Sequence, residues 1–205
     1  VTKFCYLGDT LGAGGGVEEA ARARVRCAWA KFKELSPILT ARGASYRIKG
    51  KIYKACVQSV LTYGTETWAM KIANLQSLER TERMMVRWMC GVLLKDRKPS
   101  VDLYNLLGVE SVAEVVRRGR LRWFGHVERK SGDDWVSACR NVVVAGVRCA
   151  GRGRKTWREC VKDDMEELGL HPEWVVFRDM WRASYREKRL TLAERGRNGR
   201  FKNKW

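Results

Sequence analysis

Two pairs of adjacent aspartates are the residues in this sequence best suited to hold metal ions. Asp133-Asp134 and Asp163-Asp164 could each bind divalent cations that assist phosphoryl transfer, provided that the pair lies at a turn between strands. The first pair follows a Ser-Gly step and is expected to cap a helix. The second lies inside the helix that Thr156 is expected to open. We therefore expect neither pair to be catalytic.

Histidines and cysteines offer a second kind of chemistry. His126 is one of two histidines, and the sequence places no serine, cysteine or carboxylate to form a triad with it. A zinc site from His126, Cys139, Cys149 and Cys160 can be drawn, but structural zinc favours ligands paired two to four residues apart, and no C-x-x-C is present. We expect a structural or backbone-binding role for His126 and no metal site. The seven widely spaced cysteines are typical of free thiols in a reducing, intracellular compartment.

Positive charge dominates the composition. The chain has 41 Lys and Arg against 23 Asp and Glu, a formal net charge of +18, and both halves share the excess. A folded chain this basic favours a polyanionic partner, because phosphate contacts release condensed counterions. A soluble basic protein without such a partner and a binder of acidic lipids are the alternatives. No run of 18 apolar residues is present, so we expect no membrane span.

Some of these cations recur at helical spacing. Arg47, Lys51 and Lys54 project from one face of an expected helix, and without interleaved acids they repel one another. Such a row is suited to phosphates, although a solvated face is the alternative. Arg117, Arg118 and Arg122 lie opposite the apolar stripe of a later helix that also carries aromatic residues, a pattern suited to backbone contact with base stacking.

Apolar periodicity predicts the elements that must position these residues. A strand is expected near the N-terminus, then helices over about 17–35, 45–62 and 71–90 that form a compact three-helix bundle. Further helices are expected near 102–107, 111–128 and 156–168 and after Pro172, followed by a basic tail that we expect to be disordered alone. The fold class is therefore mainly α with a short N-terminal hairpin. Expected core positions in the second and third helices include Ile48, Ile52, Ile72 and Leu78.

Five strings resemble, in order, the C-terminal part of reverse transcriptases from non-LTR retrotransposons of the LINE type, nearest the RTE/BovB-like kind. They cover nearly the whole chain. The strings are F-C-Y-L-G (4–8), L-T-Y-G-T-E-T-W (61–68), L-E with R-M-M-V-R (78–87), R-W-F-G-H-V-E-R (122–129) and G-R-G-R-K-T-W (151–157). The last departs from the family at Gly153, where proline is usual.

This resemblance implies a domain order. Residues 1–16 would end the polymerase palm as a primer-grip hairpin, 17–96 would form the helical thumb, 97–194 a C-terminal helical basic region and 195–205 a basic disordered tail. The chain also starts inside an expected strand, so we expect it to be cut from a longer protein. The family's Y/F-x-D-D turn, which holds catalytic Mg²⁺, is missing here. We therefore expect this chain to be inactive alone and to need no cofactor, with the palm and fingers upstream in the same polypeptide.

The charge pattern and the resemblance together give a set of candidate nucleic-acid-binding residues. They are Phe4, Tyr6, Leu7 and Gly8 at the primer terminus; Arg47, Lys51 and Lys54 on the thumb; and Arg117, Arg118, Arg122, His126, Arg129, Arg152, Arg154 and Lys155 downstream. The expected partners are an RNA template and an RNA–DNA or DNA duplex, with no membrane. The expected location is the nucleus, after cytoplasmic synthesis. The alternatives are a non-enzymatic RNA- or DNA-binding remnant of such an element and a helical protein–protein adaptor.

Overall fold

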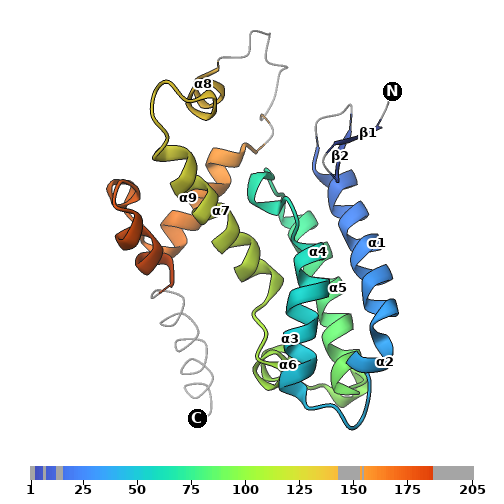
Figure 1. Cartoon of the computed structure of the whole chain (residues 1–205). Coiled ribbons are helices and arrows are strands. Elements are labelled where there is room, and N and C mark those ends of the chain that lie inside the picture. Colours follow the sequence, from blue (N-terminus) through green and yellow to red (C-terminus); the bar gives the residue numbers. More distant parts are fainter. Residues whose placement is uncertain (1–2, 7, 13–15, 143–152, 154, 187–205) are drawn as a thin grey trace. The chain divides into compact units, whose positions relative to one another are not determined.

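The computed structural model describes residues 3–6, 8–12, 16–142, 153 and 155–186 (Figure 1). Within these ranges the chain is mainly helical, with one antiparallel hairpin at the N-terminal end, which confirms the expected fold class. Leu7, Arg152, Arg154 and the tail 195–205 lie outside the described residues. The chain divides into two compact units, residues 1–116 and 117–205.

The first unit begins with strands β1 (Lys3–Tyr6) and β2 (Asp9–Gly12), in which Tyr6 pairs with Asp9. Helix α1 (Glu18–Glu34) and the short α2 (Ser36–Leu39) follow. Three segments then run on without a break as α3 (Tyr46–Ile52), the π-helical η1 (Tyr53–Gln58) and α4 (Ser59–Leu61), and we call this run the 46–61 helix. The elements that follow in this unit are η2 (Thr65–Thr67), α5 (Ile72–Cys90), η3 (Leu94–Asp96) and α6 (Ser100–Leu107).

Local sequence signals set the ends of these helices. The Ser45 hydroxyl accepts a hydrogen bond from the Ile48 N–H at 3.4 Å, as its N-cap position predicts. Gly91 and Gly108 follow α5 and α6 with φ of 64° and 67°, a left-handed conformation that glycine adopts without steric cost. The observed helices therefore lie within a few residues of the expected ones.

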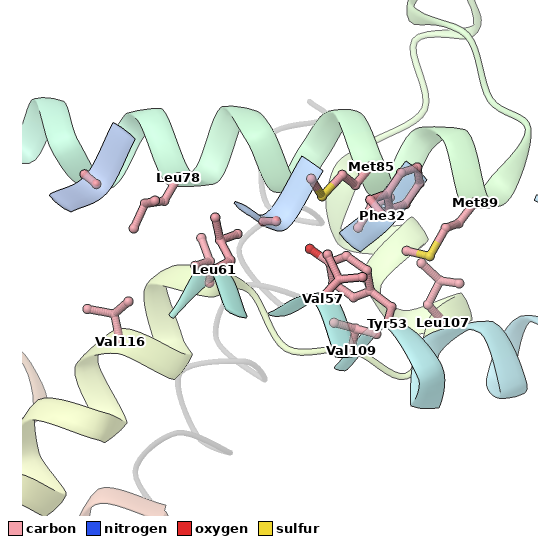
Figure 2. Close-up of a cluster of buried hydrophobic side chains, with 14 of the residues drawn as sticks. Phe32, Tyr53, Val57, Leu61, Leu78, Met85, Met89, Leu107, Val109 and Val116 are labelled. Atoms are coloured by element: carbon pink, nitrogen blue, oxygen red, sulfur yellow. The ribbon is translucent and has the colours of Figure 1, made fainter. Parts of the chain in front are cut away.

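The core of the first unit lies between α1, the 46–61 helix and α5. Figure 2 shows side chains of α5 pointing toward those of the 46–61 helix, with Leu107, Val109 and Val116 from later elements in the same cluster. Since residues after 96 complete this core, the first compact unit extends past the expected thumb boundary at residue 96. Gly50 is required where α3 meets α6, because a Cβ there would lie 1.9 Å from the Leu107 carbonyl oxygen.

Two expected core residues are on the surface. Ile48 is 54% exposed and Ile72 is 74% exposed, so the core positions expected at these residues are wrong. In the 46–61 helix the buried face carries Gly50, Tyr53 and Val57 instead. This face packs against α6 at Gly50, and the apolar pattern of the sequence does not reveal this contact.

The second unit contains most of α7 (Val112–Glu128), then α8 (Trp135–Asn141), α9 (Trp157–Leu168), η4 (Pro172–Val175) and a helical segment over 178–186. Its core gathers Leu121, Met165 and Trp181 with their apolar neighbours. The Trp181 indole N–H donates to the Leu121 carbonyl at 2.9 Å. A Cβ on Gly125 would lie 2.4 Å from that indole nitrogen, so this glycine admits the ring against α7.

Helix α9 begins directly after Thr156, as expected, and its first turn forms a capping box. The Glu159 carboxylate accepts from the Thr156 N–H at 2.6 Å, and the Thr156 hydroxyl accepts from the Glu159 N–H at 3.3 Å. Asp163 and Asp164 therefore lie within a helix and not at a turn between strands. Among the described residues, no helix has the length and apolar character to cross a membrane.

Candidate nucleic-acid interface

The N-terminal hairpin packs against residues 61–68, the second of the five strings described above. The Trp68 indole N–H donates to the Asp9 carboxylate at 3.0 Å. The Arg24 guanidinium donates to the Gly8 carbonyl and lies 4.6 Å above the centre of the Tyr63 ring. Gly8 and Gly64 both have positive φ, 78° and 77°. Two strings more than 50 residues apart in the sequence thus form one corner of the first unit.

An aromatic pair is exposed on this hairpin. Phe4 and Tyr6 are each 58% exposed, and their rings are stacked with centroids 6.3 Å apart and an interplanar angle of 22°. Alternate residues of a strand point to the same side, which explains why the two rings meet. Exposed stacked rings can accept a nucleic-acid base or sugar by further stacking. Leu7, between them and Gly8, lies outside the described residues.

The row of cations on the 46–61 helix faces solvent. Arg47, Lys51 and Lys54 are all exposed, and none of them forms an ion pair with a carboxylate of the described residues. The Arg47 side chain extends over Gly108, where a Cβ would lie 2.7 Å from its Nη1. At about 1.5 Å of rise per residue the row covers about 10 Å. Its charge is therefore available to an external polyanion.

The arginines of α7 are placed differently. Arg117 contacts Glu167 at 2.9 Å and Asp164 at 3.7 Å, and the buried Arg120 contacts Asp164 at 3.0 Å. The contact between Arg120 and Asp164 has ion-pair distance without hydrogen-bond angles, so the attraction is mainly between charges. Arg129, the residue after α7, donates to the Val175 carbonyl at 2.8 Å. Much of the positive charge of this helix therefore interacts with acids of the second unit itself.

The remaining candidates of the second unit are of three kinds. Arg122 and His126 are exposed one turn apart, and the His126 ring stacks on Trp123 with centroids 5.2 Å apart. Arg118 is half-buried and interacts within the protein. Lys155 forms an ion pair with Asp163, which raises the pKa of the lysine. The exposed cation of α7 that keeps its charge free of ion pairs within the described residues is Arg122.

Glu82 forms a site that sequence reasoning missed. This carboxylate, on α5, is fully buried and accepts hydrogen bonds from four donors, which lie on three other elements. The donors are the Tyr53 hydroxyl (3.4 Å), the Gln58 amide (2.9 Å), the Tyr104 hydroxyl (3.1 Å) and the Val112 N–H (2.6 Å). An acid on the apolar stripe of an expected helix, four residues after Leu78 and three before Met85, is the sequence signal that could have revealed it.

Burial raises the pKa of two carboxyls, the buried Glu82 and the partly buried Asp164. For Glu82 the desolvation outweighs the four hydrogen bonds, which favour the charged form. For Asp164 burial raises the pKa to about 6, against the attraction of Arg120 and Arg117. Neither acid belongs to a metal-binding cluster, since no group of three or more His, Cys, Asp or Glu in the described residues could hold an ion. Both are instead positioning groups within their own units.

Comparison with known proteins finds a similarity to a transposon-derived protein. A protein of Caenorhabditis elegans, described as uncharacterized and transposon-derived, is 26% identical to this chain over 141 residues. The match covers 67% of this chain and 50% of that protein, so the chain spans half the length of its curated relative. No family model and no solved structure matches the chain. The similarity points to an origin in a transposable element.

Proposed function

We propose that this chain is the nucleic-acid-binding C-terminal region of a transposon-encoded reverse transcriptase, in which the first unit grips a template–primer duplex. The observation that carries the proposal is the exposed row Arg47, Lys51 and Lys54, which no carboxylate of the described residues neutralises. The five family-like strings and the transposon-derived relative support the choice of polymerase. The stacked Phe4 and Tyr6 rings would support the primer terminus.

The polymerase chemistry would belong to palm and fingers domains upstream in the same polypeptide. The described residues gather no carboxylate cluster that fits Mg²⁺, so no metal-dependent step is assigned to this chain. Its own task would be to hold an RNA template with its RNA–DNA or DNA duplex. The exposed Arg122 and His126 would add contacts to target nucleic acid, and the nucleus is where such a duplex would form.

A salt titration of duplex binding tests whether the cation row binds the phosphate backbone. The logarithm of the affinity of the 205-residue chain should fall linearly with the logarithm of salt concentration. Replacing Arg47, Lys51 and Lys54 together by Ala should reduce the slope by about 2–3, at roughly 0.7–0.9 per phosphate contact. A matched control removes three other exposed cations of the first unit, Arg26, Lys33 and Lys95, and should change the slope much less. If the two triple variants change the slope equally, the row contributes only to the net charge of the chain and makes no specific contacts with the duplex.

A non-enzymatic remnant of such an element is the second candidate, because the relative is described only as transposon-derived. It would bind nucleic acid through the same row. The two candidates differ in the reading frame upstream of Val1. An in-frame Y/F-x-D-D turn within roughly a hundred residues supports the polymerase, and a start codon directly before Val1 supports the remnant.

A further inference from the structure

Lys49 is a buried cation with no counterion among the described residues. It lies on α3 with 4% of its surface exposed, and its ammonium donates to the Met89 carbonyl at 3.0 Å. The ammonium also lies 5.4 Å from the centre of the Tyr46 ring. No carboxylate of the described residues forms an ion pair with it. A buried ammonium is costly without a negative partner, and one carbonyl uses only one of its three donors.

Lys49 also lines a pocket of about 380 Å³. It is bounded by the segment 40–46, by Lys49 and by the last residues of α5, including Cys90. Arg42 supplies a second cation, and Ser45 and Tyr46 supply hydroxyl groups. No acid lines the pocket. The site therefore offers two positive charges and several donors to one small anion.

We propose that this pocket binds a phosphate monoester at the end of a nucleic-acid strand. Two cations match the two negative charges of a monoester, whereas a phosphodiester within a strand carries one. The volume suits a group of roughly mononucleotide size. A phosphate held between two sugars cannot approach an ammonium this deeply buried, but a terminal one can. The choice of a nucleic-acid strand as the source of the phosphate rests on the proposed function, because Arg47, the first residue of the cation row, lies on the same helix as Lys49. The choice of a phosphate monoester as the ligand does not rest on it.

Oligonucleotides of one sequence that differ only at their ends test the proposal. Strands with a 5′-phosphate, a 3′-phosphate or only hydroxyl ends are titrated against the 205-residue chain at fixed salt. One of the phosphorylated strands should bind about tenfold more tightly than the hydroxyl strand, as expected for one or two charge-assisted hydrogen bonds. Equal affinity for all three strands would overturn the proposal.

Variants assign the preference to the pocket. Arg42→Gln, at an exposed position, and Lys49→Met, which keeps the unbranched shape of the buried side chain and removes its charged end, should each lose most of the preference. Both should bind the hydroxyl strand nearly as wild type does. Lys33→Met removes an exposed cation of α1 that has no ion pair within the described residues, and should keep the preference. A preference that survives in Arg42→Gln and Lys49→Met would place the phosphate elsewhere.

Protection of Cys90 gives a readout in the unmodified protein, which does not depend on a variant folding. The phosphorylated strand should slow alkylation of this half-buried thiol, measured by mass spectrometry, while the exposed Cys27 should react as before. Protection by inorganic phosphate together with equal affinity for all strands would identify free phosphate as the ligand and overturn the strand-end proposal. Absence of salt-sensitive binding to any strand would instead contradict the proposed function. Salt-sensitive binding without end preference or protection contradicts the pocket alone.

Discussion

Two groups of basic residues, one on the 46–61 helix of the first unit and one on α7 in the second, are placed in opposite ways. In the first unit, Arg47 and its neighbours in the row face solvent without ion pairs among the described residues, and the buried acid Glu82 is held by neutral donors. In the second unit, Arg117 and Arg120 pair with acids of α9. Similar stretches of basic residues on helices can therefore have different roles. The acids that face them from elsewhere in the fold decide which charges remain available to a ligand.

The largest expected effect comes from removing Asp164, the acid that pairs with Arg117 and Arg120 of α7. Asp164→Ala leaves Arg120 buried without its partner, and we expect a loss of about 3–5 kcal/mol in the free energy of unfolding. Urea denaturation followed by tryptophan fluorescence measures this loss. The control Asp163→Ala breaks the exposed pair with Lys155 and should cost about 0–1 kcal/mol. Similar losses for both variants would mean that Arg120 does not depend on Asp164.

The buried acid of the first unit should give stability a pH dependence. Because burial raises the folded-state pKa of Glu82 above its ordinary value of 4.5, the stability that this group contributes is full below that value and is lost as the pH rises toward the folded-state pKa. Glu82→Gln should remove this loss, which amounts to about 1.4 kcal/mol for every pH unit between the unfolded-state and folded-state pKa values.

Unfolding free energies of wild type and Glu82→Gln between pH 4.5 and 7 measure the difference. The variant should gain stability relative to wild type as the pH rises. Glu79→Gln, on the same helix but in a partly exposed pair with Arg83, is the control and should show no comparable gain. A relative loss with rising pH would mean that the four donors stabilise the charged carboxylate more than burial destabilises it.

The smallest expected effect comes from a substitution that removes an ion pair of α7, so that an arginine of the second unit becomes more like the unpaired cations of the first. Glu167→Gln removes the exposed partner of Arg117 and should make some of its charge available to phosphate. The salt slope of duplex binding should then steepen by at most about 0.7–0.9, the value of one contact. Glu166→Gln, which loses only an exposed pair with Lys162, is the control. If both variants steepen the slope equally, the change reflects net charge and not the release of Arg117.

Local signals allowed most of the helices to be predicted. Ser45, the Thr156 capping box and the glycines after α5, α6 and α9 act within one turn of chain, so their effect can be read from neighbouring residues. The site residues were harder to predict. Arg117 and Arg122 have the same side chain on one helix, yet the first pairs with Glu167 from 50 residues away and the second is exposed. The burial of Ile48 was wrongly predicted because the helix packs against α6 through the face that carries Gly50, a contact between residues more than 50 positions apart.

The sequence by itself determined the helical class, the ends of the helices and the large excess of positive charge, because these depend on composition and on interactions a few residues long. Only the tertiary structure decided which cations are paired, that Lys49 is buried beside a pocket, and that Glu82 joins four donors from three elements. The residues that pair with these charged groups are tens of positions away in the sequence. Burial strengthens their interactions, so the packing of the fold decides which of them act within the protein and which are presented to a ligand.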